Sequence, residues 1–172
     1  IQDLAPVPHA VFARRFISLP GQGTPVFGVP GRGTPPVRVA AGGSPLLSLN
    51  QLEHDILRPR FGDARVHFAI VCASRGCPPL QARAFRADRL DAQLDAAVAA
   101  TLGDPARTVW RPSDRTLALS AVFEWFANDF VRDQGSVVAW VAAHSTPERA
   151  AELDAAPVAL STLPWDWSLN GL

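Results

Sequence analysis

The chain has 172 residues, and its 48% hydrophobic and 19% charged residues indicate one globular domain of ordinary size rather than a disordered protein. Sixteen basic residues, all arginine, balance sixteen acidic ones, so no net charge recruits nucleic acid or an anionic membrane. No apolar run reaches the roughly 18 residues that span a bilayer, so we expect no transmembrane segment.

The amino-acid usage is also biased. Alanine, arginine and proline are frequent, whereas lysine, methionine and tyrosine are absent, which we interpret as a GC-rich bacterial coding bias. Because the chain begins at Ile1 and holds no methionine, we expect a processed protein or a fragment from which any leader is missing. A cytoplasmic and a periplasmic location both stay open, since two cysteines do not settle the redox compartment.

The N-terminal part is rich in glycine and proline. Residues 1–46 contain "LPGQGTPVFGVPGRGTPPV", which predicts turns and irregular chain with short extended pieces such as Val37–Ala40, possible partners in an edge hairpin. We expect residues 47–172 to form a single globular domain.

That domain begins with a predicted helix in "SLNQLEHDILRP". Ser48 is a favourable N-cap, Gln51 completes a capping box, and Pro59 is expected to end the helix. The next segment, "VHFAIVCA", is β-branched and almost entirely apolar, which is typical of a strand buried on both faces.

The remaining elements alternate between helix and strand. They are a helix over Asp88–Leu102, a hairpin turning at Pro112–Asp114, an aromatic helix in "SAVFEWFANDFVRD", short helices over Val137–Ala143 and Pro147–Ala155, and a strand over Pro157–Leu163. This alternation predicts a single α+β or mixed α/β domain, in which about five helices pack against a small central sheet.

The only two cysteines, Cys72 and Cys77, lie on either side of a predicted turn. Cys72 is either a buried core residue or a thiol whose pKa is lowered by Arg75, and we expect Cys77 to be the more exposed of the two. A disulfide between them is sterically possible, although the spacing is not that of a redox Cys-x-x-Cys motif. Zinc would need two further ligands, such as His54 and His67, at a spacing that is absent, so we expect no metal and no cofactor.

Two other groups are candidates for chemistry. His54 lies off the apolar stripe of its helix, so it is either a solvated histidine or a general acid or base whose basicity the neighbouring Glu53 and Asp55 raise. Asp166 lies between two tryptophans, as a turn-capping group or as a carboxylate that orients a histidine.

Four segments in order, "SLNQLEHDILRP", "RVHFAIVCASRGCPPL", "LSAVFEWFANDF" and "LPWDWSLN", resemble the signature blocks of the family called domain of unknown function 547. The resemblance covers about Leu47 to Asn170. It implies that the following positions match characteristic residues of that family: Glu53, His54, Arg58, His67, Cys72, Ser74, Cys77, Pro78, Asp166 and Asn170. The family's usual first helix has no counterpart here, and the family brings no settled reaction.

Three functions therefore stay open. One is a thiol-dependent hydrolase or acyl-transferase, with Cys72 as nucleophile, His54 as base, and Glu53 or Asp166 as the orienting carboxylate. In that case His67, Ser74, Arg75, Arg58, Cys77 and Asn170 would contribute to binding. The second is a non-catalytic scaffold that binds a protein or peptide. The third is a redox-responsive protein in which Cys72 and Cys77 form a reversible disulfide.

Overall fold

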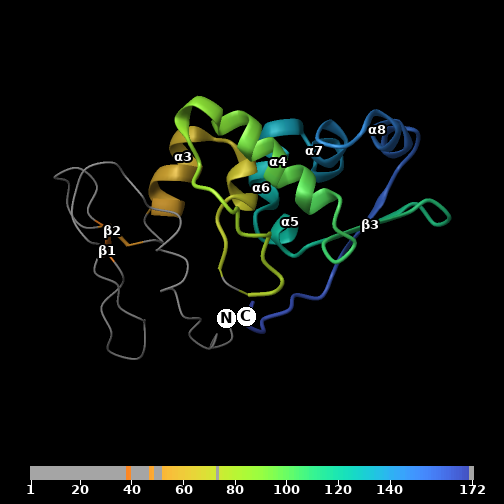
Figure 1. Cartoon of the computed structure of the whole chain (residues 1–172). Helices are drawn as coiled ribbons and strands as arrows, with labels where there is room; N and C mark the ends of the chain where they lie inside the picture. Colours follow the sequence, from red (N-terminus) through yellow and green to blue (C-terminus); the bar gives the residue numbers. More distant parts are fainter. Residues whose placement is uncertain (1–37, 40–46, 49–51, 73, 171–172) are drawn as a thin grey trace.

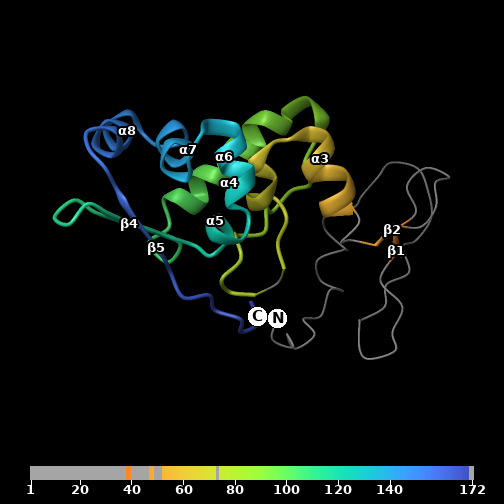
Figure 2. The same ribbon diagram turned by 180° about the vertical axis from the view of Figure 1, so that it is seen from behind.

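The computed structural model describes residues 38–39, 47–48, 52–72 and 74–170. These residues form an α+β fold: the helices pack side by side, and a small three-stranded sheet lies along one side of them (Figures 1 and 2). Apart from the short strand β1, the predicted irregular segment 1–46 lies outside the described residues, so the boundary at residue 46 stays a prediction. Within the described residues, no helix is long and apolar enough to cross a membrane.

The first described elements are two short strands and a helix. β1 (Arg38–Val39) pairs antiparallel with β2 (Leu47–Ser48), which agrees with the extended piece predicted near residue 38. The π-helix η1 (Leu52–Leu57) continues directly into α3 (Arg58–Phe61). Gln51 lies outside the described residues, so the predicted capping box stays a prediction.

The prediction that Pro59 ends this helix is wrong. Pro59 lies just after the junction of η1 and α3, where the hydrogen-bond pattern changes from that of a π-helix to that of an α-helix, and the helix continues past it to Phe61. The helix instead ends at Gly62, whose φ of 61° places it in the left-handed region that favours glycine.

The strand predicted in "VHFAIVCA" is also absent. Residues Ala64–Phe68 form a 3₁₀ helix, η2, and the chain then runs irregularly towards Cys72. The side chain of Asp63 accepts from the N–H of Arg65, and Asp133 accepts from the N–H of Ala64 at 3.0 Å. Because these side chains satisfy the first N–H groups, the apolar run turns into a helix and directs Phe68 into the core.

The predictions for the later elements are largely confirmed. A 3₁₀ turn, η3 (Ala87–Arg89), leads into α4 (Leu90–Leu102), and β3 (Thr108–Arg111) forms a hairpin with β4 (Thr116–Leu119). Thr146 caps α8 (Pro147–Asp154), and Ser136 caps α7 (Val137–Ala143) by accepting from the N–H of Ala139. β5 (Ala159–Thr162) completes the sheet by pairing parallel with β4, which gives the order β3-β4-β5.

The predicted aromatic helix is split in two. α5 (Val122–Trp125) ends at Phe126, whose φ of −114° and ψ of 24° are not helical, and α6 (Ala127–Gln134) follows. The break lets Trp125 and Phe126 point to different neighbours, as described below. Phe123 and Phe130 remain on the buried side and pack with Phe68 and Trp140.

The hydrophobic core therefore lies between the helices and the inner face of β4. Its largest fully buried side chains include Trp140, Phe68, Phe130 and Leu117. Stacked and edge-on aromatic pairs contribute to packing beyond the area that they bury. This core fixes η2 on one side and α5 and α6 on the other, and the two candidate sites are built on these elements.

Candidate functional site

The candidate site residues fall into two groups. Cys72 together with residues 74–77, here called the cysteine loop, forms the first. The second, here called the Asp129 network, comprises His54, Arg58, His67 and Asp129. Phe126 and Trp125 are adjacent in sequence at the end of α5. Phe126 contacts the network, and Trp125 contacts the aromatic side chains beside the cysteine loop.

Cys72 and Cys77 are joined by a disulfide, with a Cα–Cα separation of 6.1 Å that lies within the usual range for such bonds. Their exposure is opposite to the prediction: Cys77 is only 6% exposed, whereas Cys72 is half-buried. The predicted placement of Cys72 at the end of a strand is wrong because η2 replaces that strand. The turn around Ser74 and Gly76 instead carries Cys77 inward against the core.

Polar groups surround both sulfur atoms. The backbone N–H of Cys72 donates to Cys77 Sγ at 2.8 Å, and the hydroxyl of Ser74, fully buried, lies 3.1 Å from Cys72 Sγ. Hydrogen bonds to sulfur favour the thiolate over the thiol. Each sulfur therefore has a donor within reach that would stabilise it as a thiolate if the disulfide opened.

Arg107, which precedes β3, anchors the loop through two of its backbone carbonyls. Its guanidinium donates to the carbonyl of Cys77 at 2.7 and 3.0 Å and to the carbonyl of Arg75 at 3.0 Å. Asp104 is its ion-pair partner. Burial lowers the pKa of Arg107 from its ordinary value. A guanidinium still stays charged in proteins, so these are charge-assisted bonds that hold the Cys77 end in place.

The C-terminal residues 165–169, here called the strap, run along the cysteine loop (Figures 1 and 2). The N–H of Arg75 donates to the carbonyl of Ser168, the N–H of Gly76 donates to the carbonyl of Asp166, both at 2.9 Å, and Ser74 forms a β-bridge with Leu169.

Gly76 is required by its contact with the strap. A Cβ atom at this position would lie 2.7 Å from the ring of Trp165, closer than real Cβ contacts come. Trp165 also packs against Trp125 with ring centroids 4.7 Å apart, and Trp167 stacks on Trp125 at 5.8 Å. Trp125 and Trp167 remain 48% and 47% exposed, so half of this aromatic surface faces solvent.

Asp166 does not orient a histidine in this arrangement. It is exposed, and its carboxylate accepts from the N–H and the hydroxyl of Ser168, which lowers the pKa of Asp166. It therefore caps a turn within the strap, the first of the two predicted roles. Asn170 follows the strap and is exposed, while Glu53 is half-buried in η1.

The Asp129 network joins three elements through one buried carboxylate. Asp129 Oδ2 accepts from Arg58 Nε at 2.7 Å and from His67 Nε2 at 2.8 Å. Burial alone would raise the pKa of Asp129, but the hydrogen bonds from Arg58 and His67 outweigh it and keep the pKa below its ordinary value. Asp129 is thus an anion that ties α3 and η2 to α6.

Burial lowers the pKa of His67, and its bond to Asp129 offsets this only in part. The neutral ring must carry its proton on Nε2, because a carboxylate can only accept. The ring also stacks on Phe126 with centroids 3.9 Å apart. His67 is therefore a buried, neutral hydrogen-bond donor rather than a base.

His54 belongs to the same network rather than to the cysteine loop. Its Nδ1 lies 2.9 Å from Arg58 Nη1, and since arginine can only donate, Nδ1 must be the acceptor. The other ring nitrogen then carries the proton, so His54 has no free lone pair for a substrate in this conformation. Among the described contacts, its ring partners are Arg58 and Phe126.

Sequence reasoning missed Asp129 and Arg107, the two charged residues that organise these groups. One feature of the sequence points to Asp129: it lies three residues after Phe126 and beside Phe130, so its charge is next to two large apolar side chains on one side of a helix. Such a residue needs a buried partner. No such feature points to Arg107, since it lies in an ordinary turn before a strand. No group of three or more His, Cys, Asp or Glu side chains within the described residues is placed to hold a metal ion.

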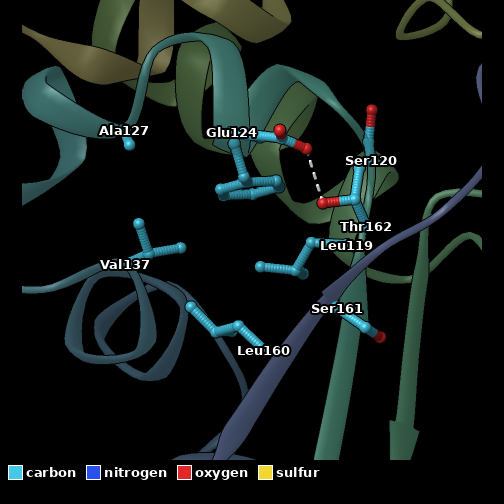
Figure 3. Close-up of a pocket in the computed structure, with 9 residues that line it drawn as sticks. Leu119, Ser120, Glu124, Ala127, Val137, Leu160, Ser161 and Thr162 are labelled. Carbon is cyan, nitrogen blue, oxygen red and sulfur yellow. Dashed lines mark hydrogen bonds between the residues drawn. The ribbon is translucent and has the colours of Figure 1, made fainter.

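A shallow pocket of ≈180 Å³ lies apart from both groups, between α5, α7 and β5 (Figure 3). Leu119, Val137 and Leu160 point into it, and Glu124 at its rim accepts a hydrogen bond from Thr162 at 2.7 Å. No cysteine or histidine lines it, so it contributes nothing to thiol chemistry.

Comparison with known proteins yields one match. Residues 37–100 match the model of a family described as "Protein of unknown function, DUF547". No curated protein and no solved structure matches the chain. The matched residues include η1, α3, η2 and the cysteine loop, whereas "LSAVFEWFANDF" and "LPWDWSLN" lie beyond them. The resemblance to domain of unknown function 547 is therefore confirmed for the segment from residue 37 to residue 100.

Proposed function

We propose that this protein is a redox-responsive domain in which Cys72 and Cys77 cycle between a disulfide and two thiols by thiol–disulfide exchange. The observation that carries the proposal is the pairing itself, in which the two cysteines bond across a short loop, with Cys72 half-buried and Cys77 buried. Exposed disulfides are the ones that exchange readily, whereas fully enclosed ones resist reduction.

The difference in exposure supports different roles for the two sulfur atoms. An incoming thiolate of a small or protein dithiol would attack Cys72 Sγ, form a mixed disulfide there, and release Cys77 as a thiolate. The N–H of Cys72, 2.8 Å from Cys77 Sγ, is placed to stabilise that leaving group. The second thiolate of the reductant then attacks the reductant sulfur of the mixed disulfide and releases Cys72 as a thiolate. The reductant leaves as a disulfide, and two electrons have passed to the protein.

The contacts of His54 favour exchange over the thiol hydrolase or acyl-transferase that the sequence also suggests. That enzyme needs Cys72 as a free thiol and a nitrogen of His54 as proton acceptor. Here Cys72 Sγ is bonded to Cys77, and His54 Nδ1 accepts from Arg58. Exchange requires neither a histidine nor an orienting carboxylate, so it uses only groups that surround the sulfur atoms.

Counting thiols in the folded chain tests the proposal. The protein is equilibrated in mixtures of reduced and oxidised dithiothreitol, and free thiols are trapped by alkylation and counted by mass spectrometry, with circular dichroism recorded in parallel. We expect a reversible transition between zero and two thiols while the fold is retained. Thiols that appear only when the chain unfolds would contradict the proposal and favour the scaffold reading.

His54→Ala provides the matched control. Because His54 takes no part in exchange, we expect the rate of reduction to stay within about twofold of that of the unaltered chain. A large loss of a Cys72-dependent reaction in this variant would instead support the hydrolase.

A further inference from the structure

We propose that the redox state of Cys72–Cys77 controls the attachment of the strap, so that opening the disulfide releases residues 165–169 and the tryptophan surface that they complete. This inference rests on the proposed redox function, and it names what that function regulates. It follows from where the strap is bound: the loop residues that contact its backbone, 74–76, lie between the two cysteines in the sequence.

The backbone of the strap bonds to the cysteine loop, and its two tryptophan rings pack on Trp125 of α5. Residues 166–169 are exposed, so little apolar burial holds them. Their backbone contacts are the bonds from Arg75 and Gly76 and the bridge between Ser74 and Leu169. Segments with few buried contacts open locally at low free energy. The conformation of the loop therefore decides whether the strap stays bound.

The two ends of the loop are held differently. Arg107 fixes the carbonyls of Arg75 and Cys77 through bonds that do not depend on the disulfide. Ser74, in contrast, is linked to Cys72 through its hydroxyl, 3.1 Å from Cys72 Sγ. Reduction would thus remove the covalent link that ties Cys72, and Ser74 hydrogen-bonded to it, to the anchored Cys77 end. The bridge at Ser74 and the N–H of Arg75 lie at the released end, so the strap would keep only the backbone bond from Gly76, whose N–H shares a planar peptide unit with the anchored carbonyl of Arg75.

The strap completes an aromatic surface. Trp165 fits against Gly76 on one side and Trp125 on the other, and Trp167 stacks on Trp125. When the strap leaves, Trp125 stays on α5 and loses both ring neighbours. Oxidation would therefore present a three-tryptophan surface, and reduction would dismantle it.

Amide hydrogen exchange by NMR on the full chain tests whether the disulfide controls the attachment of the strap, a coupling here called the device. On reduction with dithiothreitol, we expect the amides of Arg75 and Gly76 to exchange at least tenfold faster. The amide of Leu163, which bonds to the carbonyl of Leu119 at 2.8 Å just before the strap, should keep its protection. If two thiols appear and Arg75 and Gly76 remain protected, the device is overturned while the redox function stands.

Variants separate the two proposals further. Cys72→Ser/Cys77→Ser should show the fast exchange of the reduced chain without any reductant. It therefore tests the coupling even if the native disulfide resists reduction, and slow exchange in this variant overturns the device.

Gly76→Ala keeps the disulfide but drives a Cβ into Trp165, so it should release the strap in the oxidised state too. Its matched control is Gly135→Ala, strained by a φ of 78° with no atom within 4 Å of the added Cβ. This control should lower stability and leave Arg75 and Gly76 protected. Equal exchange in the two glycine variants would show that release reflects stability alone and would overturn the device.

Discussion

The Asp129 network and the cysteine loop hold neighbouring parts of one chain by different means. In the network, one buried carboxylate accepts from an arginine and a histidine, and no covalent bond is involved. In the loop, a disulfide closes the turn, and backbone hydrogen bonds hold the exposed residues 166–169 of the strap against it. The comparison shows that burial and charge stabilise the fold at Asp129, whereas a disulfide, backbone hydrogen bonds and Arg107 hold the loop.

Asp129→Ala should have the largest effect on stability. It leaves His67 buried without its acceptor and Arg58 without its anion, so we expect the free energy of unfolding to fall by about 4 kcal/mol. Chemical denaturation monitored by circular dichroism measures this. The control is Asp95→Ala, whose carboxylate is 61% exposed and pairs with Arg65 at the surface, and which should cost less than about 1 kcal/mol. A loss of similar size in both variants would contradict the role assigned to Asp129.

Removing the disulfide should cost less. Cys72→Ser/Cys77→Ser abolishes a short covalent loop, and the chain-entropy estimate for about six residues is a loss of about 2 kcal/mol. The same denaturation experiment measures it, with the oxidised form of the unaltered chain as reference and its reduced form as a control that should match the variant. A loss as large as that of Asp129→Ala would mean that the disulfide is a structural staple of the whole domain.

The smallest effect is a pH dependence that arises from His67. Its pKa in the folded chain lies below 6.5, its ordinary value, so the unfolded chain binds the proton more readily. Stability should therefore be full above about pH 6.5 and fall as the pH drops below it, by at most about 1.4 kcal/mol per pH unit. The lowered pKa of Asp129 adds a loss only at more acidic pH, below its ordinary value of 3.8.

His67→Gln keeps a donor towards Asp129 but does not titrate. Its stability should change little between pH 6.5 and pH 5, and an unchanged slope in this variant would assign the dependence to another group. Neither pH in this range nor the substitution should alter which cysteine reacts with a thiol.

The helices that carry their own start signals could be predicted from sequence. α7 follows the capping serine Ser136, and α8 follows Thr146 with a proline in its first turn, so both elements were found within one residue. Before the run from Val66 to Cys72 the local signal is a single residue, Asp63, which caps η2 by accepting from the N–H of Arg65. A short apolar run fits a buried strand or a buried helix equally, and the second contact at the start of η2 comes from Asp133, far along the chain.

The candidate site was predictable to a similar degree. The pairing of Cys72 with Cys77 could be considered from their spacing, but their relative exposure could not, because Trp165 and Arg107 reach the loop from distant segments. The Cys72–His54 pairing was suggested by residue type alone. Arg58 and Asp129, which hold His54 and His67 together, explain why residue type was insufficient.

Trapping the first intermediate of exchange tests the central claim most directly. The folded, oxidised chain is treated briefly with a limiting monothiol such as glutathione, quenched with acid, and mapped by peptide mass spectrometry. We predict a mixed disulfide on Cys72 and a free thiol on Cys77, because Cys72 is the more exposed of the two residues and its N–H stabilises the Cys77 thiolate. An adduct on Cys77, or none without denaturant, would contradict it.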